Sequence, residues 1–178
     1  MKTIKFLLTT IAVLLCSTTL EAETVQIEGI WYNLSDYSDL ASVTSSTDGT
    51  KYAGTVIIPS AVEYNNKTYT VTVINTRAFE DCYELNSVTI PESVTSIGSY
   101  AFSGCNALAS VNMRSGVRRI YDGAFEKCIS LTSIDIPEGV ISIGDDAFSG
   151  CNRLVSIKLP ASVTEIGGEA FHGCSSLT

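Results

Sequence analysis

The stretch LTSIDIPEGVISIGDDAFSGC, residues 131–151, holds the pattern that decides the fold of this chain of 178 residues. Leu131, Ile134 and Ile136 alternate with polar residues, which is typical of a strand with one buried face. Pro137 ends this strand, because proline has no N–H to donate to a continuing ladder. A second short extended piece and then an Ala-Phe turn complete the unit.

The unit recurs every 23 residues without insertion or deletion. Its Ala-Phe-x-x-Cys pattern begins at five alanines: Ala78, Ala101, Ala124, Ala147 and Ala170. Columns of Leu, Val and Ile keep the same step. No single unit can bury its own apolar side, so successive units must stack as the coils of a solenoid.

Three columns of the unit predict its local backbone. Glycine at positions 98, 144 and 167 predicts a positive φ there. The next column consists of residue types that cap helix N-termini: Thr76, Ser99, Asp122, Asp145 and Gly168. We therefore predict that Ala-Phe starts a single α- or 3₁₀-helical turn, which a residue of αL type closes before each cysteine.

Residues 131–151 and their copies resemble the BspA-type leucine-rich repeat of bacterial surface proteins. The resemblance covers residues 71–178, and the third copy departs from it with Met113-Arg114 in place of Ile-Pro and Tyr121 in place of Gly. It implies a β-rich (mixed α/β) solenoid, a right-handed coil of 23-residue repeats. It also implies attachment to host proteins, host cells or other bacteria.

Residues 1–22 are predicted to be a secretory signal peptide. Lys2 and Lys5 precede an apolar run at 6–16 and a short polar stretch, and cleavage is expected after Ala22. A lipid-modified Cys16 is the alternative, although Leu15 is larger than the residue that normally precedes such a cysteine. We expect a secreted or cell-surface protein without a transmembrane segment, because the apolar run is too short to span a bilayer.

Residues 23–70 lack the repeat and are predicted to form an N-terminal β cap that covers the first coil. Strands are expected at 25–27, 30–34, 54–58 and 68–74, with a hairpin turn at 65–67. The segment contains the only tryptophan, Trp31, and five of the eight tyrosines: Tyr32, Tyr37, Tyr52, Tyr64 and Tyr69. The alternative function of these aromatic residues is a platform for a carbohydrate or peptide.

Residues 71–178 are predicted to form the solenoid, with about four and a half repeats and an open C-terminal end. Because the break at Leu177-Thr178 falls within a repeat, the chain is interpreted as a fragment of a longer protein. A partner that covers the open coil is the alternative.

Composition excludes several function classes. The formal net charge is −8 without a basic stripe, which argues against nucleic acid as a partner. A single histidine, His172, leaves little room for histidine-based catalysis or a multi-histidine metal site. Together with the absence of a catalytic set or nucleotide motif, this predicts a protein that is not an enzyme and carries no cofactor.

The cysteine and phenylalanine columns are predicted to be internal ladders. Stacked coils place neighbouring cysteines about 4.8 Å apart, whereas a disulfide needs Cβ atoms roughly 3.8 Å apart, so buried reduced thiols are expected. Zinc is disfavoured because a ladder places its ligands along a line. A partial acidic column suggested calcium as an alternative to capping: Asp122, Asp145, Asp146 and Glu169.

The candidate function is binding, through one of two surfaces. The outward column of the first strand varies in size and charge, which is where specificity could reside: Thr89, Asn112, Asp135 and Lys158. The second candidate is the single basic cluster, Arg114, Arg118 and Arg119, for which local pairing with Glu92 and Glu138 is the alternative. We therefore predict a secreted or surface-exposed module that binds a protein or cell-surface partner, in adhesion or protein–protein interaction. The alternative is a structural spacer of a larger envelope protein.

Overall fold

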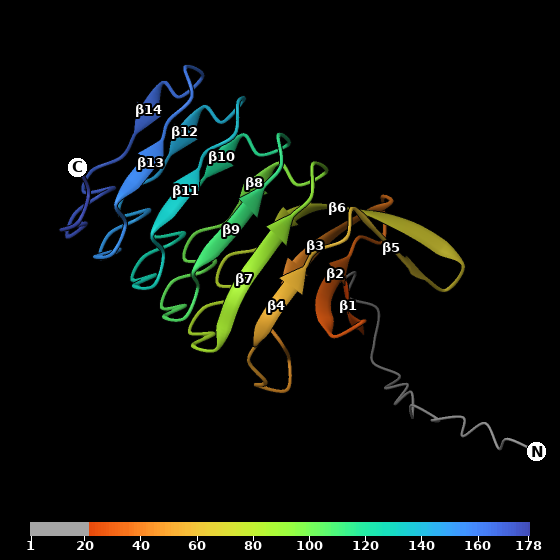
Figure 1. Ribbon diagram of the computed structural model, residues 1–178. Coiled ribbons are helices and arrows are strands. Elements are labelled where there is room, and N and C mark those ends of the chain that lie inside the picture. The colour runs from red at the N-terminus through yellow and green to blue at the C-terminus, as the bar shows by residue number, and fades with distance from the viewer. Residues whose placement is uncertain (1–21) are drawn as a thin grey trace, which may run out of the picture.

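The computed structural model describes residues 22–178, so the predicted signal peptide at 1–22 lies almost entirely outside the described residues. Within this part, the chain forms a β-rich solenoid, as the repeat predicted (Figure 1). Each coil contributes one strand to a front sheet and one short strand to a back sheet, and a third side of turns returns the chain.

The strands of the front sheet run parallel, and the paired strands of the repeats lie in register. Ser87 of one coil pairs with Ser110 of the next, and Ser133 pairs with Ser156. The apolar residues of each strand point into the core, where Leu85 and Val88 are buried. The front strands are β4 (Gly54–Ile57), β7 (Leu85–Ile90), β9 (Ser110–Met113), β11 (Ser133–Asp135) and β13 (Ser156–Lys158).

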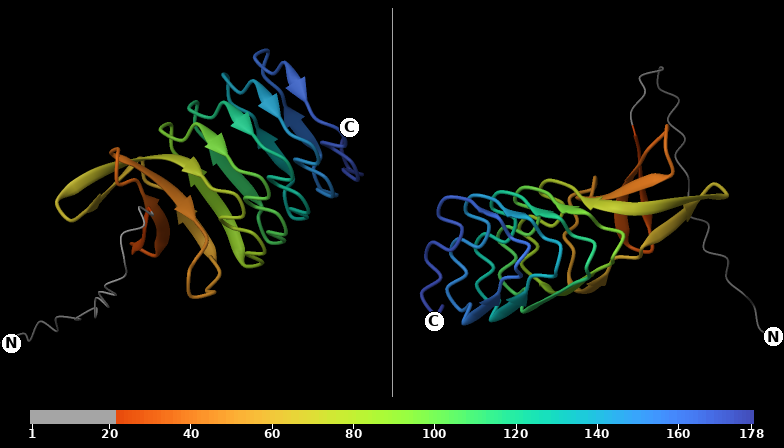
Figure 2. Two further views of the ribbon diagram at one scale, coloured as in Figure 1. Left: turned by 180° about the vertical axis from the view of Figure 1, so that it is seen from behind. Right: turned by 90° about the horizontal axis from the view of Figure 1, so that it is seen from above.

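The back sheet is longer and runs along the whole described chain. Its repeat strands are two-residue pieces that pair in parallel: β8 (Ser96–Ile97), β10 (Arg119–Ile120), β12 (Ser142–Ile143) and β14 (Glu165–Ile166). The N-terminal segment extends this sheet through five strands: β1 (Glu23–Ile27), β2 (Ile30–Leu34), β3 (Leu40–Thr44), β5 (Ala61–Tyr64) and β6 (Lys67–Ile74). Seen from above, the two sheets form opposite sides of each coil (Figure 2).

The third side is a ladder of turns, and the prediction of a helical turn is wrong for the described residues. Along each turn, one main-chain N–H donates to a carbonyl of its own coil and the following N–H donates to a carbonyl of the next coil. Ala78 N–H donates to the Asn75 carbonyl (3.2 Å), whereas Phe79 N–H donates to the Ala101 carbonyl (2.7 Å). A positive φ before each alanine, as at Arg77 (60°), turns every second N–H outward and prevents a continuous helix. The αL residue expected before each cysteine is confirmed, for example at Gly150 (φ 74°).

The glycine and N-cap columns have other roles than predicted. Gly98 does not have a positive φ; a Cβ there would lie 2.5 Å from the Thr76 nitrogen of the preceding coil, so close approach of backbones requires glycine. Asp122 and Asp145 cap the next coil instead of a helix. Asp145 N–H donates to Asp122 Oδ1 (3.0 Å), and Gly168 N–H donates to Asp145 Oδ1 (2.7 Å). The carboxylates thereby join successive coils.

The phenylalanine column is confirmed as a stacked core ladder. Neighbouring ring centroids lie 4.8 to 5.5 Å apart with interplanar angles of 3° to 8°. Tyr52 of the N-terminal segment packs on Phe79 at 4.6 Å and ends the ladder. Stacking of this kind contributes about 0.5–1.5 kcal/mol per pair beyond area burial.

The cysteine column is confirmed as a ladder of free thiols, four buried and one half-buried: Cys82, Cys105, Cys128, Cys151 and Cys174. Each thiol after the first donates to a phenylalanine carbonyl of the preceding coil. Cys128 Sγ, for example, lies 3.2 Å from the Phe102 oxygen. The same carbonyls also accept the N–H of the cysteine of their own coil, as Phe102 does from Cys105 (3.2 Å), so each thiol adds a bond between neighbouring coils.

The thiols should resist alkylation in the folded protein, with Cys174 reacting first. Burial raises the pKa of Cys174 to about 11 and that of Cys128 well above the ordinary 9.0, whereas hydrogen bonds with a neighbouring thiol lower the pKa of Cys82 and Cys151. Because the Cys128 and Cys174 thiols ionise above about pH 9 when unfolded but keep their protons when folded, these two groups should lower the free energy of unfolding as pH rises through this range. Iodoacetamide labelling read by mass spectrometry, and urea unfolding at pH 7 and 10, test this. Thiols that stay unlabelled in urea without reductant would instead indicate disulfides.

The N-terminal segment contains one strand that the alternation did not predict, β3, which pairs in parallel with β6. The two-residue turn Asn65-Asn66 joins β5 to β6, and both residues have a positive φ, as type I′ hairpins require. β4 pairs with β7 in the front sheet, with Thr55 opposite Ser87. Since 87 − 55 = 32, this first coil is nine residues longer than the 23-residue repeat, and the β5–β6 hairpin supplies the extra length.

Candidate partner-binding face

The outward side of the front sheet, here called the strand face, carries two columns of residues. One column is uniform in chemistry: Thr55, Ser87, Ser110, Ser133 and Ser156. The other varies: Ile57, Thr89, Asn112, Asp135 and Lys158. Strand alternation explains their position, because the residues between them point into the core.

The variable column is accessible along its length. Asn112, Asp135 and Lys158 are exposed, Thr89 is half-buried, and Ile57 leaves 67% of its surface in solvent. None of these side chains forms an ion pair within residues 22–178. The column is therefore free to contact a partner.

The front sheet is interrupted between β9 and β11, and a groove of about 320 Å³ lies there. Ala109 N–H donates to the Asn86 carbonyl (2.9 Å), and Val155 N–H donates to the Thr132 carbonyl (2.9 Å). The equivalent bond from Thr132 to Ala109 is missing in the described chain. The lips of the groove are the side chains that share the strand face: Ser110, Asn112, Ser133 and Asp135.

The departure of the third repeat from the pattern explains this interruption. Arg114 replaces proline and so has an N–H, which donates to the Ile90 carbonyl (3.1 Å) of the preceding coil. Gly116 packs directly on the Glu92 carbonyl, where a Cβ would overlap it. Both contacts join the third coil to the second on this side, whereas no ladder bond joins β9 to β11 within residues 22–178. Two predicted binding residues, Asn112 and Asp135, thereby face each other across a hollow.

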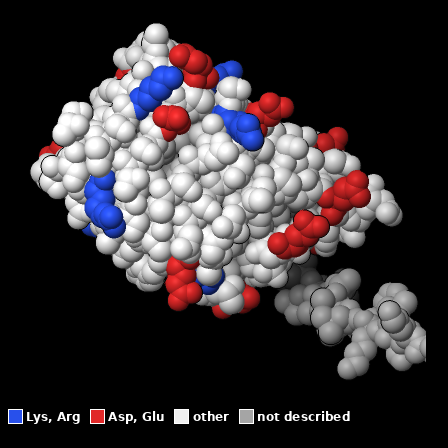
Figure 3. Space-filling view, viewed as in Figure 1, with Lys and Arg blue, Asp and Glu red and all other residues white. Residues whose placement is uncertain are grey.

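The strand face carries few charges. Figure 3 shows a mostly uncharged surface in the view of Figure 1, with acidic and basic side chains scattered and mainly near its margins. A neutral polar face costs little to expose to water and recognises partners by hydrogen bonding and shape.

The arginine cluster is split by the fold. Arg119 lies in β10 of the back sheet, in register with Ser96 and Ser142, whereas Arg114 follows the front strand β9. Arg118 lies across Gly139 of the next coil and donates to the Ser115 carbonyl (3.3 Å). The predicted local pairing of these arginines with Glu92 and Glu138 is not found in the described chain.

The aromatic residues of the N-terminal segment do not form one platform. Tyr32 is fully buried, and burial raises its pKa. Tyr52 accepts a bond from Trp31 N–H (3.0 Å) and donates to the Thr44 carbonyl (2.7 Å), and burial raises its pKa to about 12. Tyr37, in contrast, is 79% exposed on its own. Two of the aromatic side chains therefore serve the core.

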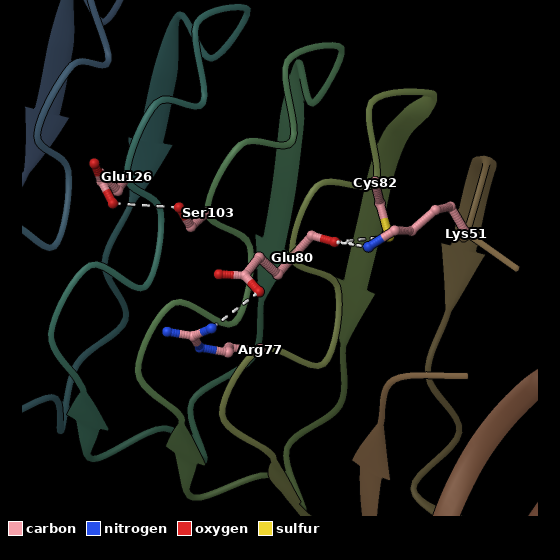
Figure 4. A network of polar contacts seen from close by, with 6 residues as sticks. All are labelled: Lys51, Arg77, Glu80, Cys82, Ser103 and Glu126. Carbon is pink, nitrogen blue, oxygen red and sulfur yellow. Dashed lines mark hydrogen bonds and ion pairs between the residues drawn. The ribbon is translucent and has the colours of Figure 1, made fainter. Parts of the chain in front are cut away.

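A polar network attaches the loop after β3 to the first turns of the solenoid (Figure 4). Lys51 Nζ donates to the Glu80 carbonyl (2.7 Å), and the Glu80 carboxylate pairs with Arg77 at 3.6 Å. In the next coils, Ser103 Oγ donates to Glu126 Oε2 (3.3 Å). These contacts connect the loop after β3 and the turns of neighbouring coils.

No group of three or more His, Cys, Asp or Glu side chains within residues 22–178 is placed to hold a metal ion. The same residues include no helix that is long and apolar enough to cross a membrane.

Comparisons with known proteins agree on the type of repeat. The family described as BspA type leucine-rich repeat region matches residues 60–178 in six copies. Among solved structures, a leucine-rich repeat protein of T. pallidum is 35% identical, with a TM-score of 0.75 over 88% of this chain and 70% of that chain. One from Bacteroides capillosus is 31% identical, with a TM-score of 0.68 over 78% of this chain and 99% of that chain.

A leucine-rich cell surface protein of Faecalibacterium prausnitzii is 26% identical, with a TM-score of 0.55 over 88% of this chain and 53% of that chain. Comparison with curated proteins finds no significant match. The family match covers well over half of the 178 residues and begins within the lengthened first coil. This chain belongs to the family of BspA-type leucine-rich repeat proteins.

Proposed function

We propose that this protein is a secreted or surface-exposed module that binds a protein or cell-surface partner through the strand face, in adhesion or a related attachment. The observation that carries the proposal is the groove between β9 and β11, which brings Asn112 and Asp135 to opposite lips of an otherwise regular polar sheet. A regular solenoid provides the frame, and the exposed variable column provides the differences that allow specificity. The similarity to a leucine-rich cell surface protein of F. prausnitzii supports the proposal that this protein is secreted or exposed at the cell surface.

Replacement of Asn112, Asp135 and Lys158 together by serine should weaken attachment at least about tenfold, because hot-spot contacts concentrate in the centre of a binding face. All three side chains are exposed, so the fold should not change. The measurement is binding of the purified protein to a panel of extracellular proteins and to whole bacterial and epithelial cells. Circular dichroism monitors folding.

The matched control is a triple variant on the back of the solenoid, Thr95→Ser, Thr164→Ser and Glu165→Ser, all exposed residues. It should bind as the wild type does. Equal binding by the strand-face variant would place the site elsewhere, with Arg114, Arg118 and Arg119 the next surface to test.

A rigid spacer is the alternative function, and the continuous phenylalanine ladder favours it. Five rings stack through successive coils, which makes the solenoid a stiff unit. Absence of binding across the whole panel would support this alternative.

A further inference from the structure

We propose that the free edge of β4 is a second docking site, at which an extended segment of a partner polypeptide adds to the front sheet as a further strand. This site lies apart from the groove between β9 and β11, and its occupant binds through main-chain hydrogen bonds. It goes beyond the proposed binding through the strand face.

The two sheets end differently on the N-terminal side of the solenoid. The back sheet continues from β6 into β3, β2 and β1, so its strands are paired further. The front sheet stops at β4, whose single neighbour in the described chain is β7 (Figure 1). The N-terminal segment thus covers the core while leaving one strand edge without a partner.

The unpaired groups of β4 can be assigned. Gly54 N–H donates to the Glu84 carbonyl (2.8 Å), and Ile58 N–H donates to the Thr89 carbonyl (3.0 Å). Because main-chain groups alternate sides along a strand, the N–H and C=O of Thr55 and Ile57 face away from β7. No hydrogen bond involves these main-chain groups within residues 22–178. They form a repeating donor and acceptor pattern that another extended backbone complements.

A groove of about 320 Å³ runs beside this edge. It is lined by Val56 and Ile57 of β4 and, on the other side, by the β1–β2 turn at Glu28 and Gly29. β4 has four residues, which pair with a segment about 13 Å long at roughly 3.3 Å per residue.

The walls indicate which side chains the segment carries. Polar and apolar side chains both line the groove, among them Glu28 and Lys51 on the one hand and Trp31 and Tyr52 on the other, so it can accept both kinds of residue. The Trp31 indole nitrogen is buried there without a hydrogen-bond partner in the described chain, and a docked strand brings carbonyl acceptors to this wall. An alternating apolar and polar segment therefore matches both the backbone pattern and the groove.

The edge of β4 has only part of the usual protection against pairing, because the strand is short but contains no charged residue or proline. Natural edge strands often contain charged residues or proline, which block addition of another strand. β4 contains only Gly, Thr, Val and Ile, and Ile57 is 67% exposed.

The probe for the test is a fluorescein-labelled, acetylated peptide with the sequence of β7, Leu85–Ile90, since this strand already pairs with β4 in the fold. Fluorescence anisotropy should show saturable binding. N-methylation of one alternate set of peptide amides should weaken binding at least about tenfold, and methylation of the other set should be tolerated, because only one peptide edge faces β4. Equal effects of both sets, or absence of saturable binding, would overturn the proposal.

Two protein variants separate the backbone from the side chain. Ile57→Pro removes an N–H that points away from β7, which an edge strand tolerates, and should weaken peptide binding about tenfold or more. Ile57→Thr keeps the N–H, so its dissociation constant for the peptide should stay within about threefold of the wild-type value. Amide hydrogen exchange of Thr55 and Ile57 should be fast in the free protein and slow with the peptide; protection in the free protein would contradict an open edge. The strand-face triple variant should bind the peptide normally, so failure here is distinct from failure of the proposed function.

Discussion

Replacement of Phe125 by alanine is expected to cost about 3–5 kcal/mol and to divide the unfolding of the solenoid into two transitions. Phe125 is fully buried and stacks between Phe102 at 5.1 Å and Phe148 at 5.3 Å. Its loss opens a cavity in the middle of the ladder. Because each coil contacts only its neighbours, the coils on either side then lose their strongest coupling.

The measurement is urea or thermal unfolding followed by circular dichroism and by the fluorescence of Trp31, which reports on the N-terminal part. Phe171→Ala is the matched control, since Phe171 is half-buried and stacks on one ring only, Phe148 at 5.5 Å. The control should unfold in one transition with a smaller loss. A wild-type melting curve for Phe125→Ala would show that the ladder does not couple the coils.

Replacement of Gly98 by alanine is expected to cost about 3 kcal/mol, through steric overlap and without any change of charge or polarity. The added Cβ would lie 2.5 Å from the Thr76 nitrogen, 2.7 Å from the Asn75 carbonyl carbon and 2.9 Å from the Ile74 oxygen. All three are backbone atoms, so no side chain can move aside. The bond from Gly98 N–H to the Ile74 carbonyl (2.8 Å) must stretch as the coils separate.

Gly168→Ala is the control for this variant. The nearest atom to its added Cβ is Asp145 Oδ1 at 3.7 Å, an ordinary contact, and Gly168 does not have a positive φ. Its free energy of unfolding should change by less than about 1 kcal/mol. The urea denaturation midpoints of both variants give the two changes in the free energy of unfolding. Equal decreases would mean that glycine at position 98 is required for backbone flexibility and not for the close contact between coils.

The solenoid itself followed from the sequence, because a period of 23 residues over five copies leaves one way to bury every apolar column. Phe125 and Cys128 recur at fixed steps, and stacking coils in register must place like residues on like residues. The ladders of rings and thiols are direct consequences of that period. The outward position of Asn112, Asp135 and Lys158 followed equally directly from strand alternation.

Predictions from the sequence were wrong where the same residue type is used in two different backbone environments. Asp145 and Gly98 have the types expected of a helix cap and of a positive φ. The structure uses Asp145 to accept a bond from the next coil and Gly98 to admit a neighbouring backbone. Local reasoning treats such residues within their own coil, whereas in a solenoid the nearest backbone often belongs to the coil 23 residues away.

The hollow between β9 and β11 and the open edge of β4 were decided by the tertiary structure alone. The replacement of proline by Arg114 was visible in the sequence, but its effect depends on an N–H reaching the Ile90 carbonyl of another coil. The edge of β4 exists because β1–β3 extend only the back sheet, which strand pairing over long separations determines. A repeat period specifies what is the same in every coil. The proposed binding surfaces lie where coils differ, and those differences become surfaces only through contacts between segments distant in the chain.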